Sequence, residues 1–71
     1  MKKEIVDFTV KEILSRIEEI RRLEIKDRMA YVGFLIHEIS GVPAVYLPLK
    51  DARYIINVLS CEIKLSDNDF S

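Results

Sequence analysis

The most unusual segment of the chain covers residues 29–49 and reads MAYVGFLIHEISGVPAVYLPL. Fourteen of its 21 residues are apolar, and Glu38 is the one residue in it with a formal charge. A stretch of this composition cannot be mostly solvated, so we expect it to lie in a core or an interface. A membrane span needs ~20 consecutive apolar residues. Because His37, Glu38, two glycines and two prolines interrupt the stretch, we expect no membrane span.

The first half of this stretch has a helical pattern, with an apolar stripe formed by Met29, Val32, Ile36 and Ile39. Asp27 is a suitable N-cap, and Ser40-Gly41 followed by Pro43 is a typical helix stop. The pattern therefore predicts a helix over about residues 27–40.

Two alternatives to this helix stay open. The first is an α+β fold in which residues 30–37 and 42–49 form a β-hairpin between two helices. Tyr, Val, Phe and Ile enrichment favours the hairpin, and Pro43 and Pro48 oppose it, because proline is confined to edge strands. The second alternative is one bent helix from Thr9 to Ser40.

Upstream, Thr9-Val10-Lys11-Glu12 has the pattern of a capping box, and Phe8 and Ile13 are placed for a hydrophobic staple. The pattern predicts a first helix over about residues 9–25, with an apolar stripe formed by Val10, Ile13, Leu14, Ile17 and Ile20. Residues 1–8 are expected to be loosely ordered, although the alternation of Val6, Phe8 and Val10 also permits a short strand.

Downstream, residues 43–47 are expected to form a short extended segment, and Pro48 suits the first turn of a helix. That helix is predicted over about residues 48–63, on the stripe Ala52, Ile55, Ile56, Leu59 and Ile63. Residues 66–71 are expected to be loosely ordered. The fold class is therefore mainly α, with three amphipathic helices in a single domain over residues 1–71.

The small size of the chain predicts self-association. A monomer of 8.3 kDa buries only ~62% of its surface on folding, so chains of this length commonly need a disulfide, a metal or another subunit. The one cysteine, Cys61, cannot form an internal disulfide, and with the one histidine, His37, it falls short of a zinc ligand set. A homo-oligomer, with a dimer favoured, is the remaining means of stabilisation.

The interface is expected on the side of the 27–40 helix that carries Tyr31, Phe34 and Leu35, together with Tyr46. A helix that is apolar nearly all round has to be buried on several sides, and two other helices of this size cannot easily cover it. The alternative is that this helix is simply the central core helix of a monomer.

The sequence lacks the residue spacings that most catalytic sites require. His37 and Glu38 point about 100° apart on a helix, and neither of the two glycines has the spacing of a phosphate-binding loop. We therefore expect no catalytic residues, no metal and no cofactor, with His37 and Cys61 in structural roles. The predicted function is that of a small adaptor, accessory subunit or regulator that binds a second copy and possible protein partners.

The alternative function is DNA or RNA binding by a basic cluster made of Arg16, Arg21, Arg22, Lys26 and Arg28. Acidic residues interleave with this cluster, and the net charge of −1 lacks the basic excess usual in such proteins. A solvated, ion-paired face is the preferred interpretation. The charged start of the chain is unlike a signal peptide and the single thiol suits a reducing compartment, so a cytoplasmic location is expected. The absence of Gln and Trp, with ten Ile, suggests a thermophilic source.

Overall fold

The structure, a computed structural model, describes residues 2–65. Within this range the chain forms four α-helices and one 3₁₀ turn, in the order α1 (Lys3–Leu14), α2 (Ile17–Arg22), α3 (Ile25–Ser40), η1 (Ala44–Tyr46) and α4 (Leu49–Ser60). The predicted mainly α class is confirmed. The alternative hairpin of residues 30–37 and 42–49 is wrong, because residues 25–40 form one continuous helix and no strand occurs between residues 2 and 65.

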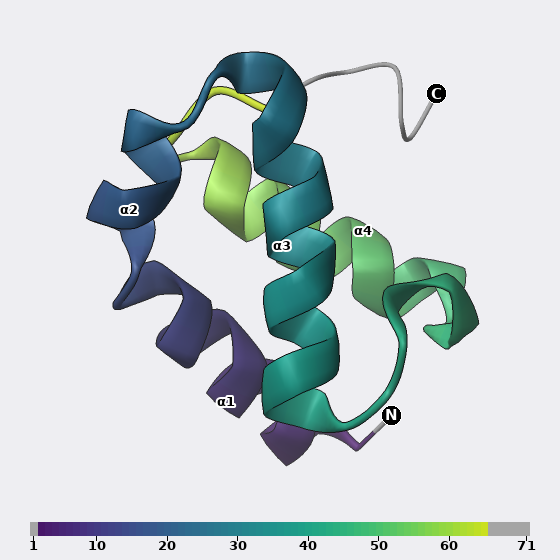
Figure 1. Cartoon of the computed structure of the whole chain (residues 1–71). Helices are drawn as coiled ribbons and strands as arrows, with labels where there is room; N and C mark the ends of the chain where they lie inside the picture. Colours follow the sequence, from purple (N-terminus) through teal and green to yellow (C-terminus); the bar gives the residue numbers. More distant parts are fainter. Residues whose placement is uncertain (1, 66–71) are drawn as a thin grey trace.

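The helix α3 lies at the centre of the fold and contacts α1, α2 and η1, while α1 also contacts α4 (Figure 1). The two longest flanking helices, α1 and α4, therefore meet each other beside α3. All four helices contribute to one hydrophobic core, which the residues after α4 complete. Its members are Val6, Val10, Ile13, Ile20, Val32, Leu35, Ile36, Leu47, Ile55, Leu59, Ile63 and Leu65.

The first helix begins at Lys3, six residues before the predicted start, so the capping box at Thr9 is wrong. Thr9 lies inside α1 with none of its surface exposed, and its Oγ1 donates a hydrogen bond to the carbonyl of Ile5 (2.7 Å). The predicted staple is wrong too, since Phe8 is exposed. Residues 3–8 are ordered as helix, because Val6 extends the stripe of Val10 and Ile13 by one turn.

The predicted helix over residues 9–25 is divided into two helices. It breaks at Ser15 and Arg16, where the Ser15 hydroxyl donates a hydrogen bond to the Glu12 carbonyl (2.5 Å). The break redirects the chain so that Ile20 of α2 is completely buried. A bent helix from Thr9 to Ser40 is also wrong, because Leu23 and Glu24 are extended between α2 and α3.

The other two predicted helices are confirmed, with changed ends. The cap of α3 is Glu24 rather than Asp27, and α3 ends at Gly41, whose φ of 78° is left-handed and whose amide donates to the His37 carbonyl (2.9 Å). Residues 43–47, predicted to be extended, contain η1 between extended residues. The helix predicted over 48–63 ends at Ser60. The prediction for residues 66–71 lies outside the described residues.

Candidate interaction surface

Large apolar side chains remain exposed on α3 and on the segment that leads into α4. The Phe34 ring is 57% exposed in the middle of α3. Val45 is 83% exposed and Tyr46 is 75% exposed on η1, and Leu49 is 61% exposed at the start of α4. Isolated exposed apolar residues are normal, but Val45, Tyr46 and Leu49 lie within five residues of one another, and exposed apolar side chains that gather in this way can mark an interaction site.

Of the four predicted interface residues, Leu35 is placed wrongly. Its side chain is only 2% exposed and belongs to the core with Val32 and Ile36. The reason is geometric: Leu35 lies three residues after Val32 and one before Ile36, on the core-facing side of α3, and both α1 and α2 pack against α3. Phe34 and Tyr46 are exposed, and Tyr31 is half-buried.

Tyr31 fixes the position of the Phe34 ring. The two rings stack with centroids 6.3 Å apart and an interplanar angle of 21°. The Tyr31 hydroxyl donates a hydrogen bond to Oε2 of Glu19 on α2 (2.9 Å). This hydrogen bond, with some desolvation and the Glu19 charge, raises the pKa of Tyr31 above its usual value. The Tyr31 ring is therefore held by Glu19 and stacks on Phe34 before any partner binds.

An apolar groove, here called the α3–α4 groove, lies along α3 and has a volume of about 380 Å³. Its walls come from α3, η1 and α4, and Lys26 is the one charged residue that lines it. The other lining residues are Met29, Ala30, Val32, Gly33, Ile36, Ala44, Leu47, Ala52 and Ile56. Four of these nine are Ala or Gly, so the groove is open because its walls carry little side-chain volume.

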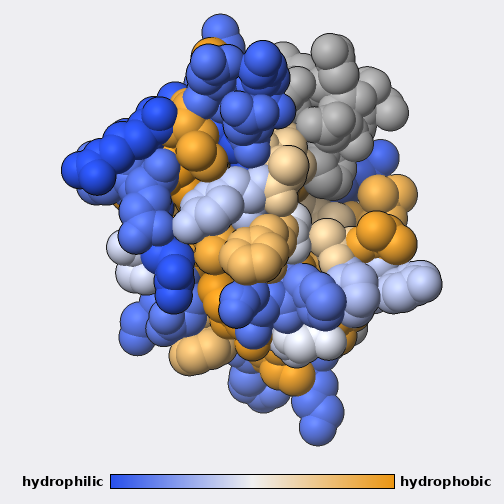
Figure 2. Space-filling view, viewed as in Figure 1, coloured by the Kyte–Doolittle hydropathy of each residue, from blue (hydrophilic) through white to orange (hydrophobic). Residues whose placement is uncertain are grey.

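The hydrophobic surface gathers over α3 in the middle of Figure 2 and continues to the right, toward η1 and the start of α4. Hydrophilic side chains cover the upper left, over α2. The apolar part of this face is therefore bordered by charged surface, as in protein interfaces with an apolar centre and a polar rim.

Three of the five residues in the basic cluster, which was the alternative site for nucleic acid, form hydrogen bonds or ion pairs within the fold. Arg28 donates three hydrogen bonds to main-chain carbonyls: to Leu23 (3.2 Å), to Arg21 (3.0 Å) and to Lys64 (2.7 Å). These bonds tie the end of α2 and the residues after α4 to α3.

The other members of the cluster are exposed, and two of them form ion pairs. Arg21 pairs with Glu18 and donates to the Glu62 carbonyl (3.1 Å), while Lys26 pairs with Glu24 (3.5 Å). Arg16 and Arg22 lie at the two ends of α2. The ion-paired interpretation of this segment matches these contacts.

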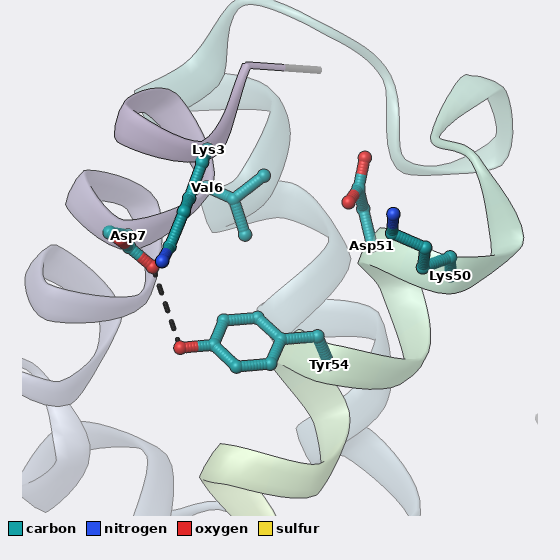
Figure 3. Close-up of a pocket in the computed structure, with 6 residues that line it drawn as sticks. All are labelled: Lys3, Val6, Asp7, Lys50, Asp51 and Tyr54. Carbon is teal, nitrogen blue, oxygen red and sulfur yellow. Dashed lines mark hydrogen bonds between the residues drawn. The ribbon is translucent and has the colours of Figure 1, made fainter.

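A second pocket, of about 420 Å³, lies between the N-terminal ends of α1 and α4. Figure 3 shows Tyr54 pointing from α4 to Asp7 on α1, and its hydroxyl donates to Oδ1 of Asp7 (3.4 Å). Two lysines and two aspartates line the pocket, so their charges balance. Sequence reasoning missed its α1 side because residues 1–8 were expected to be loosely ordered. The sequence signal that could have revealed this part of α1 is the apolar stripe of Val6, Val10 and Ile13, which continues the helix toward the N-terminus.

Cys61 and His37 are both exposed and lie on different elements. The Cys61 thiol donates to the Asn57 carbonyl (3.4 Å), which is a local contact within one turn. Between residues 2 and 65, no three His, Cys, Asp or Glu side chains gather closely enough to hold a metal ion. In the same range, no helix is both long enough and apolar enough to cross a bilayer.

Comparison of the chain with protein-family models, with curated proteins and with solved structures found no match in any of the three.

Proposed function

We propose that the protein is a small, non-enzymatic interaction protein that works as a homodimer, through a surface formed by α3 and η1. The observation that carries this proposal is the pair of exposed rings, Phe34 and Tyr46, on two elements, α3 and η1, that also supply walls of an apolar groove. Aromatic side chains contribute most to the energy of interfaces because each buries ~150–250 Å². The stacking of Tyr31 on Phe34 supports the same role, because a ring that is already held loses less entropy on binding.

The free energy gained by burial of the two exposed rings can be compared with the free energy that association costs. Burial of the exposed parts of Phe34 and Tyr46 in both copies removes about 500 Å² of mostly apolar surface, if each ring exposes roughly half to three quarters of ~200 Å². At ~25 cal/mol/Å² this contributes about 12 kcal/mol, and association costs about 4–15 kcal/mol. The two rings alone therefore give at most a weak dimer, so neighbouring apolar surface has to be buried with them.

Phe34→Glu tests this surface, because Phe34 is exposed and its replacement leaves the core intact. A charge placed in the apolar interface is expected to raise the dimer dissociation constant at least tenfold. The matched control is Phe8→Glu, since Phe8 is 54% exposed on α1, close to the 57% of Phe34. Mass measured by light scattering during size-exclusion chromatography separates the outcomes.

We expect the Phe34→Glu variant to elute as a folded monomer and the Phe8→Glu variant to elute as a dimer. A dimer that survives Phe34→Glu contradicts the proposed surface, and a monomer produced by Phe8→Glu alone would place the interface on α1. Circular dichroism confirms that both variants keep their helices.

In the cell, a dimer of this kind would act as an adaptor, accessory subunit or regulator by binding to the surface of another protein. The cytoplasm is the proposed compartment. Its support is the single exposed thiol of Cys61, since an unpaired cysteine is usual where the glutathione pool keeps thiols reduced.

A further inference from the structure

Among residues 2–65, the most exposed large apolar side chains lie directly beside the apolar groove. Val45, Tyr46 and Leu49, here called the η1 ridge, stand on η1 and on the first residue of α4. Ala44 and Leu47 of the same segment line the α3–α4 groove. A projection and a cavity therefore lie next to each other on one face.

We propose that two copies pack about a two-fold axis, with the η1 ridge of each copy inserted into the α3–α4 groove of the other. A two-fold interface uses the same patch on both subunits, so the patch has to complement itself. A patch that contains both the ridge and the groove meets this condition. The arrangement rests on the self-association proposed above and specifies how the two copies fit together.

The η1 ridge cannot fill the groove of its own chain. A 3₁₀ helix has three residues per turn, so Ala44 and Leu47 share one side, and Val45 and Tyr46 point to the other two. Ala44 and Leu47 already face the groove, and the Ala44 Cβ lies 3.8 Å from the position of a Cβ on Gly33. The ridge therefore does not fill its own groove and stays open to a second molecule.

The groove has the right size for the ridge of a second copy. A cavity of ~150 Å³ accommodates one benzene-sized group. At about 380 Å³, the α3–α4 groove has space for between two and three such groups. The ridge offers one phenol ring and two aliphatic side chains, so the groove has space for most of the ridge.

The charge pattern supports the same occupant. Residues 39–49 carry no formal charge, so insertion of the ridge buries no ionised group. Lys26 is the one charged residue that lines the groove, and its ammonium already pairs with Glu24. Burial of unpaired charge is the main penalty at the centre of an interface, and this arrangement avoids it.

The ridge is also rigid before binding. The amide of Tyr46 donates to the Pro43 carbonyl (2.9 Å), and the amide of Leu47 donates to the Ala44 carbonyl (3.1 Å). Pro43 and Pro48 flank this turn and fix their own backbone angles. A preformed ridge loses little entropy on docking.

Disulfide trapping between two differently tagged chains tests the arrangement. Both chains carry Cys61→Ala, which removes the one native thiol. One chain carries Val45→Cys on the ridge, with Tyr46 retained, and the other carries Ala30→Cys on the wall of the groove. A disulfide forms only when the two Cα atoms come within about 4.4–6.8 Å. The control partner for the Val45→Cys chain carries Lys11→Cys, an exposed position on α1.

We expect at least tenfold more disulfide between positions 45 and 30 than between positions 45 and 11, measured by mass spectrometry without reductant. Equal yields from both pairs, with sedimentation still showing dimers, would overturn the ridge-in-groove arrangement and leave self-association in place. Monomers at every concentration would overturn both proposals.

Two substitutions provide a test without cysteines. Tyr46→Ala removes the largest part of the ridge, and Ala52→Leu fills the groove from α4. Each is expected to raise the dimer dissociation constant at least tenfold, with the helical circular dichroism unchanged. The control, Tyr54→Ala, removes a half-exposed tyrosine that lines the other pocket and is expected to stay within twofold. An unchanged dissociation constant for both test variants contradicts the arrangement.

Discussion

Gly33 of α3 and Ala44 of η1 lie against each other, so that a Cβ atom added to Gly33 would stand 3.8 Å from the Ala44 Cβ. This distance is ordinary van der Waals contact. Position 33 therefore has space for a methyl group, although its helix and η1 approach closely there. The pair forms part of the wall of the α3–α4 groove.

Gly33→Ala is expected to raise the free energy of unfolding by about 0.5–1 kcal/mol. Glycine inside a helix is destabilising relative to alanine by this amount, and the added methyl meets no atom closer than 3.8 Å. Urea unfolding at a fixed protein concentration measures the change. The contrasting variant is Gly41→Ala, which is expected to lower the free energy of unfolding by about 1–2 kcal/mol, because φ is 78° at Gly41. Equal effects at the two glycines would contradict the assigned backbone.

Arg28→Ala is expected to lower the free energy of unfolding by about 1–3 kcal/mol. The guanidinium donates to three carbonyls, and its removal leaves the residues after α4 without their bond to α3. Arg22→Ala is the control of the same residue type, because Arg22 is exposed on α2, and a change within about 0.5 kcal/mol is expected. Thermal or urea unfolding compares the two variants. If both substitutions lower the free energy of unfolding by the same amount, the hydrogen bonds of Arg28 have no special structural role.

Thr9→Val is expected to change the free energy of unfolding by less than about 0.5 kcal/mol. Thr9 lies in the interior of α1, where its hydroxyl donates to the Ile5 carbonyl, and valine has nearly the same shape. If Thr9 were instead the N-cap of the helix, the same change would cost about 1 kcal/mol. Chemical denaturation therefore distinguishes the two positions of the helix start. Glu12→Ala serves as a second check, since an N3 residue of a capping box would also lose stability.

Tyr31 is expected to titrate above its ordinary pKa of 10.0, because its protonated hydroxyl donates to the Glu19 carboxylate. Since the folded-state pKa is raised, this hydrogen bond contributes stability below the unfolded pKa and loses it as pH rises through the folded pKa. Glu19→Gln removes the charge and should lower the pKa of Tyr31. Absorbance of tyrosinate in a chain with Tyr46→Phe and Tyr54→Phe measures Tyr31 alone. An unchanged midpoint after Glu19→Gln would contradict the contact.

The fold class and three helical regions could be predicted because the apolar stripes of Val32, Ile36 and Ile39 and of Ile55 and Leu59 repeat at the helical period. The start of α1 could not be predicted from the same rule. Thr9 followed by Glu12 has a local pattern that suits a helix start, yet burial of Val6 against the core overrides it. Local capping preferences are worth about 1 kcal/mol, and burial of one valine is worth more.

The candidate site could be predicted only in part. Phe34 and Tyr46 are exposed, as an interface on this side requires, whereas Leu35 is buried because neighbouring helices cover a wider face of α3 than the sequence suggests. The hydrogen bond from Arg28 to the Lys64 carbonyl joins residues that lie 36 positions apart in the chain, and no local pattern reveals such a contact. The α3–α4 groove was missed for the same reason, since its walls come from three elements.

Sedimentation equilibrium of the native chain across micromolar concentrations measures self-association without any substitution, because it reports the mass of the particle in solution. For a homodimer, the apparent mass is expected to rise with concentration from 8.3 kDa toward twice that value. The fitted model should be a monomer–dimer equilibrium, as expected for a closed two-fold interface. A single species of 8.3 kDa at every concentration would contradict the account.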